Sequence, residues 1–173
     1  SDGDNGEVEF NKKDKSETLS IPVIYLTKSG KETYLKDASA IYDIRLKVDI
    51  GESERTGHNV IGYMNNNAAS TVIIGAHYDH LGYGEDGNSM LRNGPKQIHN
   101  GADDNASGTA ALAELATLLS KSKSKNNNYL FIAFSGEELG LFGSKYFTEH
   151  PTIDLSSVNY MINMDMIGRL NDS

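Results

Sequence analysis

Apolar residues gather along the chain in short runs that predict strands. The run Thr71–Ala76 is continuously apolar and β-branched, which is typical of a strand buried on both faces. Tyr129–Phe134 predicts another buried strand, and Val158–Met164 predicts the last one. Weaker strand patterns follow the same logic at Ile21–Leu26, at Ile41–Ile50 and at Asn59–Met64.

Helical spacing appears between these runs. Residues 106–119 place five apolar side chains on one helical face. They are Ala111, Leu112, Leu115, Leu118 and Leu119. A second helix is expected from about Leu141 to Thr148, and a short one begins near Lys31 after a turn at residues 27–30. The glycine-rich stretch 81–99 predicts a long loop, and loops of that length are usually functional.

Strands separated by helices predict an α/β fold with three layers, α/β/α, and a sheet that is largely parallel at its centre. The strands between residues 41 and 64 have no helix between them, so we expect an antiparallel edge and a mixed sheet. Residues 1–17 are polar and charge-rich, which predicts a tail. We therefore divide the chain into residues 1–36 and a main domain, residues 37–173.

Composition narrows the possible partners. The chain of 173 residues has 16 Lys and Arg against 24 Asp and Glu, a net charge of −8, which argues against nucleic acid as a main partner. No apolar run approaches the roughly 18 residues that a membrane span needs. There is no Cys, so only His, Asp and Glu remain as strong metal ligands.

Such residues cluster near the ends of the predicted strands, where open α/β sheets bind their ligands. The candidates are His77, Asp79, Asp104, Glu137, Glu138 and Asp165. One His with several carboxylates suits Zn²⁺ or another divalent ion. Each motif also has a plain structural interpretation: a surface cluster for His-Tyr-Asp-His, and acidic residues at a helix start for Gly-Glu-Glu. Asp165 lies between two Met residues, and a carboxylate in an apolar run is costly unless it is paired or bound to metal.

Four segments together resemble the zinc-dependent aminopeptidases with two co-catalytic metals, metallopeptidase family twenty-eight. They are Gly75–His80, Gly101–Gly108, Phe134–Glu138 and Asn163–Gly168, and the resemblance runs from about Gly57 to the end of the chain. Residues 20–35 resemble the last part of a protease-associated insert that many relatives carry.

The resemblance implies a role for each candidate. His77 and Asp165 would be terminal ligands of two different zinc ions, Asp104 would bridge them, and Glu138 would bind one of them. It also implies that Glu137 is the general base and that Asp79 orients His77. The peptide between Asp104 and Asn105 matches one that is cis in relatives.

The family also has a fifth ligand, a His well beyond the Asn-Met-Asp motif, and the chain has no His after that motif. We expect none of the other His residues to replace it: His58, His80, His99 and His150. The chain is therefore expected to be truncated at its C-terminus, with an incomplete fold, an open site and partial metal occupancy.

For the complete protein, the resemblance implies removal of N-terminal residues from peptides and a secreted or periplasmic location. A glutaminyl cyclase or a carboxypeptidase on the same fold is an alternative enzyme. A non-catalytic interaction domain, which would bind no metal, is an alternative from another class.

Overall fold

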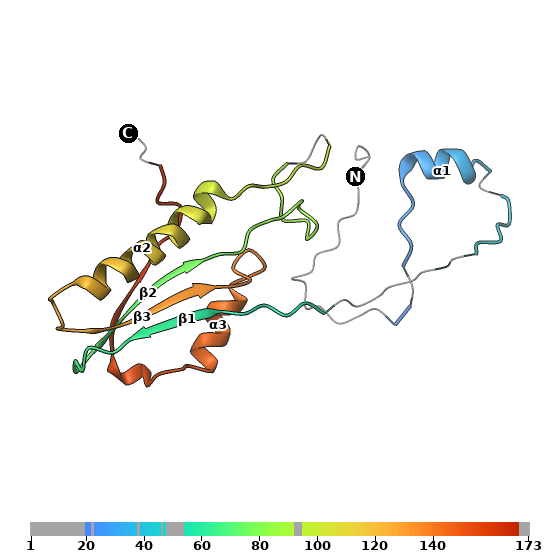
Figure 1. The fold of residues 1–173 in the computed structure, drawn as a ribbon. Helices are drawn as coiled ribbons and strands as arrows, with labels where there is room; N and C mark the ends of the chain where they lie inside the picture. The colour runs from blue at the N-terminus through green and yellow to red at the C-terminus, as the bar shows by residue number, and fades with distance from the viewer. Residues whose placement is uncertain are drawn as a thin grey trace. The chain divides into compact units, whose positions relative to one another are not determined.

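The computed structural model describes residues 20–21, 23–37, 39–45, 47, 54–91 and 95–169 (Figure 1). The chain divides into two compact units, Ser1–Glu52 and Ser53–Ser173. The expected polar tail, residues 1–17, lies outside the described residues. The division of the chain at residue 36 and the insert remnant stay predictions.

The first unit contains one helix, α1 (Lys28–Tyr34), among its described residues. The hydroxyl of Thr27 accepts a hydrogen bond from the Gly30 N–H at 3.1 Å and so caps the helix start. The helix therefore begins earlier than the sequence pattern indicates, and the predicted turn at residues 27–30 is its cap and first turn.

The two strands predicted in this unit are not found. Residues 23–27 and 41–45 have no strand pairing in the structure, and their apolar side chains are exposed. A strand needs a neighbour to satisfy its backbone hydrogen bonds, and none pairs with these segments within the described part of the chain. The rest of the predicted strand 41–50, apart from Lys47, lies outside the described residues.

The second unit is built on a four-stranded sheet with the strand order β1-β3-β2-β4. Its strands are β1 (Val60–Met64), β2 (Thr71–His77), β3 (Asn128–Phe134) and β4 (Val158–Asn163). β2 pairs in parallel with both β3 and β4, and β1 pairs antiparallel with β3. The predicted mixed sheet with a parallel centre and an antiparallel edge is confirmed.

A helix covers each face of this sheet, which confirms the three layers (Figure 1). On one face, Leu112 of α2 (Gly108–Lys121) packs with Val72, Ile74 and Phe131. On the other face, Phe147 of α3 (Phe142–Glu149) packs in a second cluster of buried residues. That cluster contains Ile73, Leu130, Ile132 and Phe134.

The buried face of α2 differs from the predicted one at one position. Leu118 is 54% exposed, whereas Ala116 packs against the core together with Ala111, Leu115 and Leu119. Among the described residues, no helix is long and apolar enough to cross a membrane.

Candidate metal centre

The carboxyl ends of the three parallel strands meet at one edge of the sheet. His77, the last residue of β2, pairs with Phe134, the last residue of β3. Gly75 pairs with Asn163 at the end of β4, two residues before Asp165. Glu137 and Glu138 follow β3 at the same edge. The register of the sheet therefore brings three of the sequence motifs together.

The fourth motif reaches this edge through an irregular helical turn, η1 (Ala102–Ser107), that precedes α2. Asp104 and Asn105 have non-helical backbone angles within it, and the peptide between them is cis, as the resemblance implies. The hydroxyl of Thr109, in the first turn of α2, donates a hydrogen bond to the His77 carbonyl at 2.9 Å. The start of α2 is thereby fastened to the end of β2.

The side chains at this edge form two groups that could each hold a cation. His77, Asp104 and Asp165 offer ligand atoms within 4.8 Å of one another, and so do His80, Asp104 and Glu138. Nε2 of His77 lies 3.1 Å from Oδ1 of Asp104 and 3.6 Å from Oδ1 of Asp165. Asp104 belongs to both groups, as a bridging carboxylate would.

The hydrogen-bond pattern of these atoms fits a metal. His77 Nε2, His80 Nδ1 and Glu138 Oε1 are buried, and none has a hydrogen-bond partner in the described part of the chain. Buried polar atoms without partners are costly, so native proteins rarely keep them. A divalent cation accepts electron pairs from imidazole nitrogen and carboxylate oxygen alike. The donor set therefore suits zinc.

Asp79 holds the loop that carries the two glutamates. Its carboxylate oxygens accept hydrogen bonds from the N–H of Glu137 at 3.1 Å and from the N–H of Glu138 at 3.2 Å. Nδ1 of His77 pairs with the backbone carbonyl of Asp79 at 3.0 Å, whereas the nearer carboxylate oxygen is 3.7 Å away. The ring of His77 is thus oriented mainly by the carbonyl, because the carboxylate is engaged by the loop.

Glu137 lies beside the candidate ligands without belonging to either group. Its Oε2 is 3.8 Å from Nε2 of His77. Burial raises the pKa of its carboxyl, and three neighbouring carboxylates raise it further against the opposing charge of His77. Burial lowers the pKa of His77, but the Asp79 carbonyl and nearby carboxylates outweigh it, so this pKa is raised.

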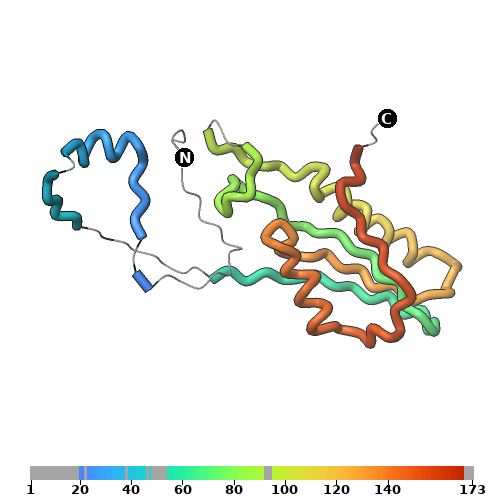
Figure 2. The backbone as a smooth tube through the Cα atoms, turned by 180° about the vertical axis from the view of Figure 1, so that it is seen from behind, coloured from blue at the N-terminus to red at the C-terminus, as the bar shows by residue number. Residues whose placement is uncertain are grey.

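Asn105 is a residue whose role the sequence pattern did not reveal. Its side chain is only 1% exposed and joins η1 to α2 and to the end of β4. Nδ2 donates to the Met164 carbonyl at 2.9 Å, and Oδ1 accepts from the N–H of Gly108 at 3.0 Å and of Met166 at 3.3 Å. Figure 2 shows the segment after β4 next to the start of α2. This amide therefore fixes the separation of Asp104 and Asp165.

We expect Asn105→Ala to lower the free energy of unfolding of the metal-free chain by at least about 2 kcal/mol. The Met164 carbonyl and the Gly108 N–H would both lose their buried partner, at roughly 1–3 kcal/mol each. Chemical denaturation followed by circular dichroism measures the change. Asn65→Ala, at an exposed turn residue, is the control. Equal stability of the two variants would contradict the anchoring role.

Asp103 is next to Asp104 in the sequence, but its hydrogen bonds hold the loops of the protein together. Its Oδ1 accepts a hydrogen bond from the Gly168 N–H at 2.8 Å, and the Ser107 hydroxyl donates to its carbonyl at 2.6 Å. The carboxylate therefore ties the loop after β4 to η1. This geometry is consistent with the expectation that Asp104, and not Asp103, is shared by the two groups.

His80 also lies at the candidate metal centre, although the sequence pattern did not place it there. Its Nδ1 lies 2.7 Å from Oε1 of Glu138. The signal in the sequence was its position three residues after His77, directly before a glycine-rich loop. His99 contacts the edge of the His80 ring, with 6.3 Å between centroids, but belongs to neither ligand group.

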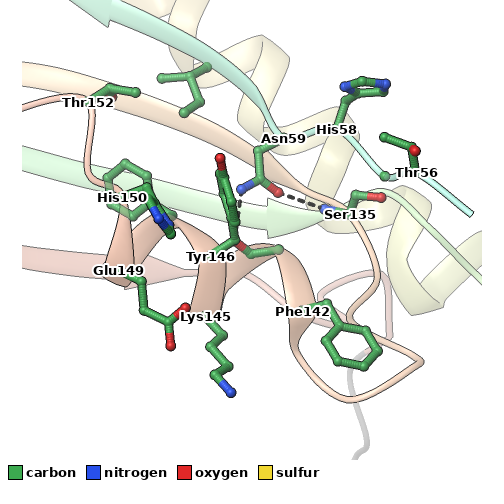
Figure 3. Close-up of a pocket in the computed structure, with 14 residues that line it drawn as sticks. Thr56, His58, Asn59, Ser135, Phe142, Lys145, Tyr146, Glu149, His150 and Thr152 are labelled. Carbon is green, nitrogen blue, oxygen red and sulfur yellow. Dashed lines mark hydrogen bonds between the residues drawn. The ribbon is translucent and has the colours of Figure 1, made fainter.

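A separate cavity of about 700 Å³ lies between α3 and the segment before β1 (Figure 3). Asn59 lies beside it, accepting a hydrogen bond from the Ser135 N–H at 3.1 Å and donating to the Gly143 carbonyl at 2.8 Å. Tyr146 and His150 stack along α3 with ring centroids 4.5 Å apart. None of the ligand candidates lines this cavity. Asn59 instead fixes the start of α3 against the end of β3.

Two curated proteins resemble the chain over most of its length. Aminopeptidase YwaD of Bacillus subtilis is 31% identical over 87% of this chain and 29% of its own length. The probable lipoprotein aminopeptidase LpqL of Mycobacterium tuberculosis is 30% identical over 88% of this chain and 27% of its own. The chain thus spans less than a third of the length of these relatives.

Solved structures show the same fold at lower identity. A Zn-dependent exopeptidase from Parabacteroides distasonis matches with a TM-score of 0.56 and 24% identity, and a glutaminyl cyclase from Bacteroides thetaiotaomicron with 0.55 and 24%. Each match covers 65% of this chain and 42% of the other. Residues 59–173 match the sequence pattern of peptidase family M28. The chain therefore belongs to peptidase family M28.

Proposed function

We propose that the chain carries the metal centre of a zinc-dependent exopeptidase that removes N-terminal residues from peptides. The observation that carries this proposal is the pair of ligand groups that share Asp104, with Glu137 beside them and outside both. Names of relatives support the aminopeptidase assignment. The likeness to a glutaminyl cyclase shows the fold alone.

The ligand residues divide as follows in this proposal. His77 and Asp165 hold one zinc ion, Glu138 holds the second, and Asp104 bridges them. When bound, such a pair of ions polarises the scissile carbonyl and lowers the pKa of water. The acidic surroundings also attract the positively charged amino terminus of a peptide.

Glu137 is the proposed general base. Its carboxylate Oε2 accepts the proton of the attacking water and later donates it to the amine that leaves. A raised pKa brings the group closer to the pH at which it must both accept and release a proton. Asp79 positions this base by holding its backbone N–H, and so acts through the loop.

The first test compares chromogenic aminoacyl substrates with a free and an acetylated amino group. We expect release from the free substrate only, loss of turnover after chelation, and recovery when zinc is restored. Equal hydrolysis of both substrates would contradict an aminopeptidase. Conversion of an N-terminal Gln to pyroglutamate as the main product would favour the cyclase, and cleavage at a free C-terminus would favour the carboxypeptidase.

The location is proposed from similarity alone. One relative is described as a probable lipoprotein aminopeptidase, which supports a secreted or envelope location for this protein. Peptides are the proposed partners, since the substrates of a peptidase family are peptides.

A further inference from the structure

Asn59 joins the two ends of the loop that carries the two glutamates (the glutamate loop, residues 135–143). It directly precedes β1, whose antiparallel pairing with β3 brings it to the end of β3. Its Oδ1 accepts a hydrogen bond from the Ser135 N–H at 3.1 Å, and its Nδ2 donates one to the Gly143 carbonyl at 2.8 Å (Figure 3). One half-buried amide therefore bridges the point where the loop leaves the sheet and the point where it enters α3.

The two ends of the glutamate loop also lie directly against each other. A Cβ on Gly143 would meet the Ser135 carbonyl oxygen and Oδ1 of Asn59, and would lie 2.8 Å from the Ser135 nitrogen. Only glycine permits so close an approach of two backbone segments. The amide of Asn59 holds the ends of the loop at this distance.

Backbone hydrogen bonds tie the interior of the loop together. The carbonyl of Glu137 accepts hydrogen bonds from the N–H of Gly140 and of Leu141, each at 2.9 Å. The N–H of Glu137 itself is held by the Asp79 carboxylate at 3.1 Å. A shift at either end of the loop is therefore transmitted to the backbone of Glu137.

The attachment of α3 to the sheet does not depend on this amide. Phe147 of α3 is 5% exposed and packs edge-on against Phe134 of β3, with 6.4 Å between the ring centroids. These apolar contacts hold the body of the helix, whereas Asn59 acts at its first turn. The specific effect of the amide falls on the loop between β3 and α3.

We infer that Asn59 is a positioning residue for the proposed general base, Glu137, and acts through the backbone of the glutamate loop. This inference rests on the proposed function, because it concerns the same reaction. Asp79 and Asn59 then hold the loop at two places, the N–H of the base and the ends of the loop. Two attachments fix the orientation of the loop as well as its location.

The first test is hydrogen exchange, followed by mass spectrometry, on the metal-free chain. Asn59→Ala should speed the exchange of the bonded amides within residues 136–142 by at least about tenfold, the effect of losing two hydrogen bonds. Asn128→Ala is the matched control, because this buried Asn also bonds to backbone groups, those of Asn66 and Ala68, at the opposite end of β3. It should leave exchange within residues 136–142 unchanged.

The second test is steady-state kinetics with zinc in excess. Asn59→Ala should lower kcat by about 100-fold, the loss that a displacement of about 1 Å can cause, with KM little changed. Asn128→Ala should keep the kcat of the unmodified chain, because its lost hydrogen bonds lie away from the base. Asn59→Asp keeps an acceptor for the Ser135 N–H and should restore part of the kcat that Asn59→Ala loses.

The two tests separate failure of the inference from failure of the proposed function. The inference is overturned if Asn59→Ala exchanges within residues 136–142 like the control, or if it raises KM at unchanged kcat. If the unmodified chain has no zinc-dependent turnover, the proposed function fails, and hydrogen exchange alone decides whether Asn59 holds the loop. If Asn59→Ala does not fold, Asn59→Asp takes its place: faster exchange and a lower kcat than in the unmodified chain support the inference, and no change in either overturns it.

Discussion

Asp104→Asn is expected to remove zinc from both positions at once. Asp104 is the residue that the two ligand groups share, so its neutral replacement leaves each ion with one carboxylate fewer. We expect both binding events to weaken by more than about 100-fold, since even changes outside the ligand set cost up to that much. Elemental analysis after gel filtration measures the stoichiometry, and any zinc-dependent turnover should disappear with it.

Asp103→Asn is the matched control, with the same chemical change one residue away. The Oδ1 atom of Asn can still accept the hydrogen bond that Asp103 accepts from the Gly168 N–H. This variant should therefore fold and keep its zinc. Equal zinc loss in the two variants would mean that the negative charge of the loop, and not the bridge, determines binding.

Glu137→Gln is expected to lower turnover by about 10²–10⁴-fold, the usual contribution of a general base, while zinc stoichiometry stays unchanged. Glu137 is near Nε2 of His77 but belongs to neither ligand group. Steady-state kinetics with zinc analysis on the same sample measure both. Loss of zinc from this variant would make Glu137 a ligand and not the base.

The same variant should stabilise the metal-free chain at neutral pH. Burial raises the folded-state pKa of Glu137, so above that pKa its ionised carboxyl opposes folding. Glutamine removes this opposition, and the unfolding temperature should rise. The difference should disappear as the pH falls through the folded and then the unfolded pKa, where wild-type Glu137 is protonated in both states. Thermal melts in chelator at several pH values measure it.

Buried apolar runs were sufficient to predict the sheet. Thr71–Ala76 and Tyr129–Phe134 became the two central strands. A strand inside a covered sheet pairs its backbone groups with neighbouring strands and buries its side chains on both faces, so its sequence is continuously apolar. The same reasoning is wrong for residues 23–26 of the predicted strand Ile21–Leu26, which are apolar but pair with no strand among the described residues. A local pattern does not show whether a partner strand exists.

The candidate site was predictable where motifs coincide with strand ends. All six proposed residues come to one edge of the sheet, but their roles stay predictions. Asn105 could not be found from the sequence, because its three hydrogen bonds link it to Gly108, Met164 and Met166, and two of these lie about 60 positions away. The contact of Asp79 with the glutamate loop depends on tertiary structure in the same way.

The amide of Asn105 has a consequence for the order in which the protein matures. It carries no charge and needs no metal to make its hydrogen bonds, so the loop that bears Asp104 is positioned before any ion arrives. Folding and zinc loading are then separable steps, unlike those of small domains that fold only around their metal. The metal-free chain is therefore expected to fold with this loop already in place.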